Sequence, residues 1–149
     1  MNRRERDECR ESDEAWPGFS GLFTVAELER MPADAHRYEL LDGALVVSPR
    51  PPTAHQVVAG RLASMLDRDC PQDLLVVLEP AVQLDARTEF DAALVVVPLD
   101  EVGEAKFMTP PLLVVEVRSP STALFDLNRK KAAYERFGVP SYWIVDRCG

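Results

Sequence analysis

The chain has 149 residues, of which 46% are hydrophobic and 28% are charged, and these values suit one folded domain and exclude a wholly disordered chain. The formal net charge of −8 excludes a protein that coats nucleic acid by broad phosphate neutralisation, because that binding needs clustered Lys and Arg. It does not exclude a nuclease, since acidic side chains around a divalent cation add negative charge while the loaded site still accepts a phosphate.

The cysteines and the hydropathy pattern indicate the cellular compartment of the protein. Cys9, Cys70 and Cys148 are far apart and lack the CxxC or Cys/His spacing of metal ligands, which indicates a reducing compartment and no zinc site. No apolar run approaches the length of about 18 residues that a membrane span needs, and the first residues lack the apolar stretch of a signal peptide. We therefore expect a cytoplasmic protein that makes no membrane contact.

The N-terminal part of the chain divides into a tail and the start of a domain. Residues 1–20 are charged and show no period of 2 or 3.6, so we expect a mobile tail before a folded domain over residues 21–149. Thr24 and Glu27 have the spacing of a capping box, which predicts a short helix that ends near Met31.

A β-hairpin is predicted next. Residues 37–41 and 44–47 are β-rich runs, and the Asp42-Gly43 dipeptide between them supplies the positive φ angles of a two-residue turn. Glu39 is therefore expected on the first strand of the hairpin.

The remaining elements alternate between helices and strands. Residues 53–69 carry apolar side chains at helical spacing, which predicts one buried face formed by Val57, Val58, Leu62, Met65 and Leu66. The later elements are strands at 74–78, 82–84, 92–97 and 112–117, a helix at 126–137 closed by Gly138 and Pro140, and a strand at 141–145. The third and fourth of these strands are almost continuously apolar, as in central strands buried on both faces. The order predicts an α/β fold with helices flanking a central sheet.

Glu116 is the most informative residue, because it places a carboxylate in a strand that otherwise has the composition of a buried one. An unpaired charge there would cost much free energy. The carboxylate either belongs to a functional site or forms a structural ion pair with Arg118, which is two residues on and therefore on the same strand face. Structural ion pairs also bury carboxylates, so both interpretations stay open.

Asp91 and Lys130 are candidates to join Glu116 in one site. Asp91 stands at the start of an apolar run, where it can share a cation with other convergent oxygen ligands, although an Asp at such a place often caps a turn. Lys130 shares a face of the predicted helix with Asp126 and Tyr134, and such a face is commonly a solvated stripe.

The histidines, the absence of common catalytic motifs and the distribution of charge give weaker indications of function. His36 and His55 are isolated from further metal-ligand residues, and we interpret His55 as a surface or capping residue. The chain has no nucleotide-binding, zinc-protease or serine-hydrolase motif. Basic residues outnumber acidic ones by six to four over residues 110–149, so nucleic-acid contact should favour the C-terminal third.

Five segments together resemble the Uma-type endonuclease family of the PD-(D/E)XK restriction-endonuclease-like superfamily. They are Arg37-Tyr-Glu-Leu-Leu-Asp-Gly43, Phe90-Asp-Ala-Ala-Leu-Val-Val-Val97, Leu113-Val-Val-Glu-Val-Arg-Ser-Pro-Ser-Thr122, the helix at 126–134 and Gly138-Val-Pro-Ser-Tyr-Trp-Ile-Val-Asp146. The resemblance covers the chain from about residue 23 to residue 146 and implies a restriction-endonuclease-like fold, with a central mixed β-sheet flanked by α-helices.

The resemblance also implies the roles of particular residues. Asp91 and Glu116 correspond to the metal-binding acids, Glu39 to an additional acid beside them, and Lys130 to the catalytic lysine. The cofactor would be Mg²⁺, with Mn²⁺ as a substitute, and the substrate would be DNA. Arg118 occupies the position of the superfamily's usual lysine, but Arg stays protonated and cannot act as a base.

The chain departs from the family pattern in two places. Phe90 stands where relatives carry a proline before the first metal acid, which alters the turn that aims Asp91. Relatives continue with further strands beyond the last predicted strand, whereas this sequence ends at Gly149. We therefore expect an unpaired sheet edge with exposed apolar surface, which bears on stability and on formation of a homodimer.

Three functions are compatible with the sequence. The first is a metal-dependent endonuclease that hydrolyses phosphodiester bonds in DNA. The second is a catalytically degenerate member that keeps the fold and serves as a binding or interaction module, which divalent-metal binding would distinguish from the first. The third is an unrelated function in which the acids only form ion pairs, and then Glu116→Gln would alter stability without any metal dependence.

Overall fold

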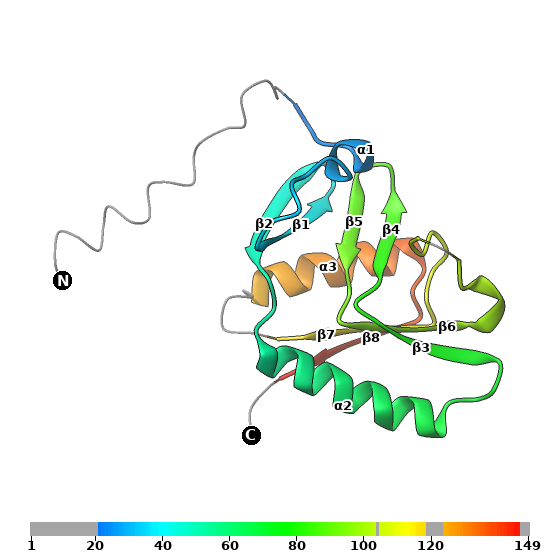
Figure 1. Ribbon diagram of the computed structural model, residues 1–149. Coiled ribbons are helices and arrows are strands. Elements are labelled where there is room, and N and C mark those ends of the chain that lie inside the picture. Colours follow the sequence, from blue (N-terminus) through cyan, green and yellow to red (C-terminus); the bar gives the residue numbers. More distant parts are fainter. Residues whose placement is uncertain (1–20, 104, 119–123, 147–149) are drawn as a thin grey trace, which may run out of the picture.

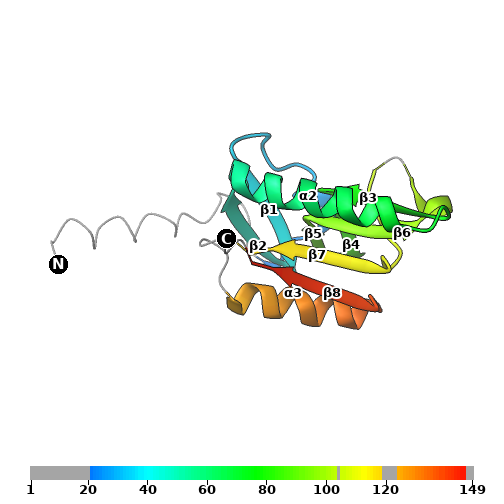
Figure 2. The same ribbon diagram turned by 90° about the horizontal axis from the view of Figure 1, so that it is seen from below.

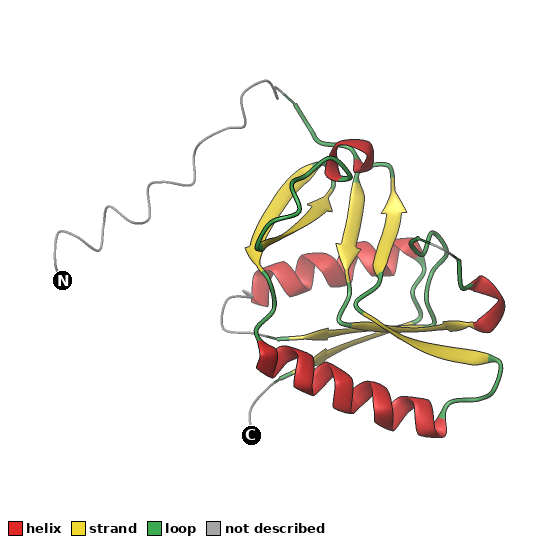
Figure 3. Cartoon of the chain, in the orientation of Figure 1, coloured by secondary structure: helices red, strands yellow, loops and turns green. Residues whose placement is uncertain are grey.

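The computed structural model describes residues 21–103, 105–118 and 124–146, so the predicted mobile tail at 1–20 lies outside the described residues. Within the described ranges the chain forms two four-stranded sheets and three α-helices (Figures 1 and 3), and none of these helices is long and apolar enough to cross a membrane. The elements are α1 (Val25–Leu28), β1 (His36–Leu41), β2 (Ala44–Pro49), α2 (Thr53–Asp69), β3 (Leu74–Leu78), β4 (Ala81–Asp85), β5 (Thr88–Asp91), β6 (Leu94–Pro98), a short 3₁₀ helix (Leu99–Glu101), β7 (Leu113–Val117), α3 (Leu124–Phe137) and β8 (Ser141–Val145).

The first sheet has the strand order β2-β1-β5-β4 and is antiparallel throughout. The predicted hairpin is confirmed, since β1 pairs with β2 and the turn residues Asp42 and Gly43 have φ angles of 49° and 85°. A side chain at Gly43 would also collide with a neighbouring segment, because an added Cβ would lie 2.7 Å from the Leu22 Cβ. The turn therefore requires glycine for two reasons.

The short helix α1 covers one face of this sheet. Its predicted capping box is confirmed, because the Glu27 carboxylate accepts hydrogen bonds from the backbone N–H and the hydroxyl of Thr24, at 2.7 and 2.9 Å. The helix ends at Leu28, earlier than predicted, and this side chain packs against Leu40 of β1. Side chains alternate along a strand, so Glu39 points to the opposite face of the sheet.

The second sheet has the order β3-β6-β7-β8 and is mixed, because β7 and β8 run parallel. The sequence predicted one strand over 92–97, but β6 begins at Leu94, and residues 88–91 form β5 of the other sheet. The chain passes between the sheets at Ala92 and Ala93, which are fully buried and small enough for this passage through the core. An apolar run alone does not show where a strand changes sheet.

Helix α2 has the predicted bounds and packs on one face of the second sheet. The side chains that make this contact are Val58, Ala59, Leu62, Ala63 and Leu66. Val57 and Met65, which the sequence predicted on the buried face, are 46% and 59% exposed. The small alanines form the centre of the contact, so the larger side chains at its margins point to solvent.

Helix α3 lies on the opposite face of the second sheet (Figure 2). It begins at Leu124, before the predicted residue 126, and closes as predicted at Gly138, which has a φ angle of 94°. Ala133 and Tyr134 of α3 join a cluster that includes strands of both sheets. Strands β6 and β7 therefore have one set of side chains under α2 and the other under α3, which explains their apolar composition.

Strand β8 forms one edge of the second sheet within the described residues. Trp143 and Ile144 on this strand are 46% and 37% exposed. Strand β8 therefore exposes apolar side chains to solvent among the described residues.

Candidate active site

Glu39 is a buried carboxylate on β1, with a side chain that is 6% exposed. One of its oxygens, Oε1, accepts a hydrogen bond from the ammonium group of Lys130 at 2.6 Å and another from the backbone N–H of Asp91 at 3.0 Å. The carboxylate thus joins α3 to the end of β5. Its inward direction follows from the alternation of β1, in which Leu40 packs against α1.

Glu116 lies on β7 and is 5% exposed at its side chain. The neighbouring residues Val115 and Val117 face α2, so the alternation of the strand turns Glu116 toward α3. Its Oε1 lies 3.4 Å from the Lys130 ammonium. The alternative pairing with Arg118 is wrong: Arg118 follows the end of β7, is exposed, and pairs with Asp146 at 3.3 Å.

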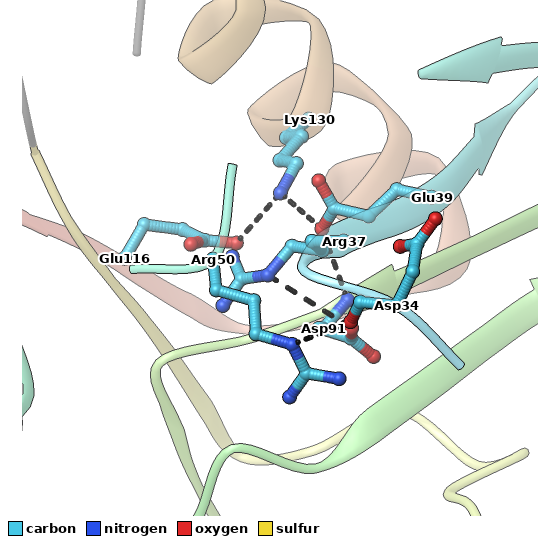
Figure 4. A network of polar contacts seen from close by, with 7 residues as sticks. All are labelled: Asp34, Arg37, Glu39, Arg50, Asp91, Glu116 and Lys130. Carbon is cyan, nitrogen blue, oxygen red and sulfur yellow. Dashed lines mark hydrogen bonds and ion pairs between the residues drawn. The ribbon is translucent and has the colours of Figure 1, made fainter. Parts of the chain in front are cut away.

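Lys130 is the cation at the centre of this group (Figure 4). Its side chain is 11% exposed and Tyr134 one turn later is fully buried, so the interpretation of this helix face as a solvated stripe is wrong for both residues. The side chain of Asp126 is not described. Burial alone would lower the pKa of Lys130, but the charges of Glu116 and Glu39 outweigh it and raise this pKa. Lys130 therefore remains an ammonium ion at neutral pH.

Asp91 ends β5, and its carboxylate is 40% exposed. Its carboxylate pairs with the Arg37 guanidinium, with 3.9 Å between Nε and Oδ2. Burial and the charge of Glu39 raise the pKa of Asp91 to about 6, although Arg37 and Lys130 oppose this rise. Asp91 is thus a partly buried carboxyl group that lies near the charge of Glu39.

Arg37 is a member of the site that the sequence analysis did not assign. It precedes Glu39 by two residues on β1, which places both side chains on one strand face, and this spacing was the available signal. The Arg37 side chain extends into the group of carboxylates (Figure 4), where its charge lowers the pKa of both Asp91 and Glu116. Two cations, Arg37 and Lys130, therefore balance three carboxylates.

These side chains line two adjoining depressions. The first has a volume of about 110 Å³ and is lined by Glu39, Glu116 and Lys130 together with the basic residues Arg37, Arg50, His55 and Arg129. The second has a volume of about 380 Å³ and contains Asp91, and it shares Arg37, Arg50 and Pro51 with the first. His55 is only 4% exposed, so its interpretation as a surface residue is wrong.

Phe90, which precedes Asp91 on β5, belongs to the hydrophobic core. It is 1% exposed, and its ring lies 5.1 Å below the Lys130 ammonium and 5.3 Å from the Tyr134 ring. A cation over an aromatic face is attracted by the ring quadrupole. Phe90 therefore helps to hold Lys130 in the pocket.

The donor set of the site suits a hard divalent cation. Carboxylate oxygens are the ligands that Mg²⁺ prefers, and Glu39, Asp91 and Glu116 surround one region. Among the residues that the structure describes, however, no three His, Cys, Asp or Glu side chains are arranged to hold a metal ion together. Lys130 and Arg37 lie between the acids, so these two cations would have to move for the carboxylates to share an ion.

The chain resembles known proteins along most of its length. The family model of Uma2, described as "Putative restriction endonuclease", matches residues 25–148. A solved structure described as a "putative nuclease belonging to DUF820", from Anabaena variabilis, superposes with a TM-score of 0.71 at 16% identity, covering 83% of this chain and 74% of that chain. No curated protein sequence matches. The structural likeness confirms the predicted restriction-endonuclease-like fold, and the extent of the family match shows that the chain belongs to the Uma2 family.

Proposed function

We propose that the protein is a metal-dependent endonuclease that hydrolyses phosphodiester bonds in DNA. The observation that carries this proposal is the convergence of Glu39, Asp91, Glu116 and Lys130, from four separate elements, on adjoining depressions at one place in the fold. Burying the Glu39 and Glu116 carboxylates close to the third carboxylate, Asp91, costs free energy, and such an arrangement is typical of a functional site. The family assignment to nuclease-like proteins agrees with it.

The three carboxylates are the residues that would hold the cofactor, which we propose to be Mg²⁺ or Mn²⁺. Such a cation, when bound, activates water and neutralises charge at a phosphate. Asp91 and Glu116 would supply ligands from the two sheets, with Glu39 beside them. The exposure of Asp91 at 40% leaves its carboxylate accessible from solvent.

Lys130 acts electrostatically in this proposal. Because its pKa is raised, it stays protonated and cannot accept a proton from water at neutral pH. Its ammonium group can instead donate hydrogen bonds to a phosphate oxygen as negative charge develops there, which is preorganised transition-state stabilisation. The contact with the Phe90 ring fixes the position from which it does so.

The arginines of the site support a phosphate as substrate. Arg37 and Arg50 lie on the wall shared by the two depressions, and Arg129 lines the first. They concentrate positive charge at the site, although the net charge of the whole chain is −8. Such a local cluster can bind a single phosphate group, whereas binding along a long DNA duplex needs positive charge over a wide surface. Arg37 and Arg50 come from the N-terminal half and Arg129 from the C-terminal third, so we propose phosphate contacts from both parts of the chain.

Cleavage assays test the proposal. We would incubate the protein with supercoiled plasmid and with single-stranded DNA in Mg²⁺, in Mn²⁺ and in EDTA, beside Asp91→Asn and Glu116→Gln. Glu135→Gln is the matched control, because Glu135 is an exposed carboxylate on α3. We expect metal-dependent cleavage that both site variants lose and the control retains. Cleavage that persists in EDTA, or in Asp91→Asn and Glu116→Gln alike, would contradict the proposal.

A second candidate is a degenerate member that binds a partner without catalysis. The observation in its favour is that Lys130 and Arg37 already balance the carboxylates and lie between them. Calorimetric titration with Mn²⁺ separates the candidates, because a degenerate site should give no saturable heat. The absence of both saturable heat and DNA cleavage would favour the binding module.

A further inference from the structure

The second depression lies beside the first and is the larger of the two. Its volume of about 380 Å³ falls within the range of about 300–1,000 Å³ that is usual for sites that bind a small organic molecule, whereas the first depression, at about 110 Å³, is below that range. Arg37, Arg50 and Pro51 line both. A ligand that reaches both depressions would therefore place a small group in the first and a larger one in the second.

Asp34 organises one wall of the second depression. Its carboxylate accepts hydrogen bonds from the Tyr38 hydroxyl and from the backbone N–H of His36, both at 2.8 Å. Its backbone carbonyl accepts a third from Nε of Arg50 at 3.1 Å (Figure 4). Tyr38, His36 and Arg50 all line the depression. A single residue at the surface thus fixes three residues of this wall.

Tyr38 gives the wall an aromatic surface. Its ring packs against the apolar cluster of Val25, Leu28 and Leu40, and its hydroxyl is held by Asp34. The His36 ring lies edge-on to it, with 6.2 Å between the centroids. Unpaired nucleic-acid bases stack on aromatic side chains, and a ring that is already fixed loses little conformational freedom when a base binds. The wall therefore suits a planar base.

Arg37 and Arg50 have N–H groups available for a ligand where the two depressions meet. The Arg37 side chain is 15% exposed, and its contact with Asp91 is an ion pair at 3.9 Å. Among the described residues its guanidinium donates no hydrogen bond, and that of Arg50 donates only through Nε. Guanidinium groups with unused donors bind phosphate oxygens, often with two parallel hydrogen bonds. These two side chains therefore suit a phosphate group.

The acidic residues of the depression are largely balanced by cations. Lys106 contacts Glu29 at 2.8 Å and Glu89 at 2.7 Å, and Arg37 pairs with Asp91. The remaining lining carboxylate belongs to Glu79, which is exposed. The acids therefore leave the arginines able to attract an anion.

We propose that the second depression binds one unpaired nucleotide of a DNA strand, with its base against Tyr38 and its phosphate at Arg37 and Arg50. This inference rests on the proposed function, which identifies the ligand as DNA, but it requires no metal ion. A duplex would have to release a nucleotide from its base stack before that nucleotide could enter, and this release costs free energy. Single-stranded DNA should therefore bind more tightly than a duplex.

Fluorescence anisotropy in EDTA tests the inference without metal or catalysis. The probes are a labelled single strand of mixed sequence and the blunt duplex of the same sequence. We expect the wild type to bind the single strand more tightly. A duplex that binds as tightly as the single strand would overturn the inference, and this comparison needs no variant.

Tyr38→Leu tests the contact with the base, because it keeps an apolar side chain on the cluster and removes the ring. We expect its affinity for the single strand to fall about fivefold or more, as when a ring that stacks on a base is lost. Tyr38→Phe, which retains the ring, should keep most of the affinity. Trp143→Leu is the matched control, because Trp143 is an exposed aromatic residue that lines neither depression. A folded Tyr38→Leu with the affinity of Trp143→Leu would overturn the inference.

Arg50→Gln tests the contact with the phosphate through its dependence on salt. The slope of log affinity against log salt concentration should become shallower by about 0.7, which is the value for one phosphate contact on a single strand. Arg61→Gln is the control, because Arg61 is an exposed arginine on α2 that lines neither depression. Equal slopes in the two variants would contradict the assigned phosphate contact.

The outcomes also separate this inference from the proposed function. Metal-dependent cleavage by a protein that binds duplex and single strand equally overturns the inference and leaves the nuclease in place. Binding of the single strand that depends on Tyr38, in a protein that cleaves no DNA, supports the inference and overturns the nuclease. A protein that neither binds nor cleaves DNA overturns both.

Discussion

Replacing Lys130 with Met should destabilise the protein strongly at neutral pH. The Lys130, Glu39 and Glu116 side chains are 11%, 6% and 5% exposed. Water therefore has little access to the two carboxylates and cannot stabilise their charges once the ammonium group is removed. Removing one partner of a buried ion pair typically costs about 3–5 kcal/mol. This loss is a large part of the total stability of about 5–15 kcal/mol that is usual for a domain.

The loss should also depend on pH in a defined direction. Burial raises the pKa of Glu116 in the folded protein, and Lys130 is the largest influence that opposes this rise. Without Lys130 the folded-state pKa of Glu116 moves further above its unfolded value, so the folded variant binds a proton that the unfolded chain does not. Its stability therefore increases as the pH falls, and the difference from the wild type becomes smaller in mildly acidic solution.

Urea unfolding followed by circular dichroism, at neutral pH and near pH 5, measures both effects. Lys131→Met is the control, because Lys131 is the next residue along α3 and is exposed, and its replacement should change stability by less than about 0.5 kcal/mol. A Lys130→Met variant as stable as Lys131→Met at neutral pH would refute the reasoning. So would a Lys130→Met deficit that grows as the pH falls.

Three further predictions follow from single contacts. Asp91→Asn should be more stable than the wild type at neutral pH and should lose this advantage in acid. Burial and Glu39 raise the pKa of Asp91 to about 6, so the wild-type carboxylate becomes protonated below that pH. A difference in the free energy of unfolding between the two proteins that is the same at every pH, measured by urea unfolding, would contradict this reasoning. Arg118→Ala should retain DNA cleavage, whereas Lys130→Ala should lower kcat by about 10²- to 10³-fold, because Lys130 contacts Glu39 and Glu116 and Arg118 contacts neither. Initial rates that fall in Arg118→Ala and not in Lys130→Ala would assign the catalytic role to Arg118 instead. Gly43→Ala should lower stability by about 1 kcal/mol or more, because alanine is strained at a φ angle of 85° and its Cβ would lie 2.7 Å from Leu22; an unchanged thermal midpoint would contradict this.

Local signals in the sequence predicted much of the fold. The Asp42-Gly43 turn and the apolar spacing of residues 53–69 defined a hairpin and a helix that the structure confirms. Local patterns did not show that the chain changes sheets at Ala92 and Ala93, because that event depends on pairing with distant strands. For the same reason Met65, which has helical spacing, lies outside the contact between α2 and the sheet.

The candidate site was predicted in part. The structure brings Glu39, Asp91, Glu116 and Lys130 together, as the family resemblance implied, although the spacing of single residues favoured other interpretations. The sequence did not identify Arg37, because its role depends on Asp91, more than fifty positions away on another strand. Long-range contacts of this kind appear only once the strands have paired.

The most direct test of the account is the rate at which supercoiled DNA is cleaved in Mn²⁺ by the wild type and by a folded Glu116→Gln variant. Glu116 is the best buried of the carboxylates that contact Lys130, and its amide would keep the shape of the side chain while removing its charge. The account predicts cleavage by the wild type that EDTA stops and that Glu116→Gln does not show. A folded wild type that leaves DNA intact in every divalent metal, or a Glu116→Gln variant that cleaves at the wild-type rate, would contradict it.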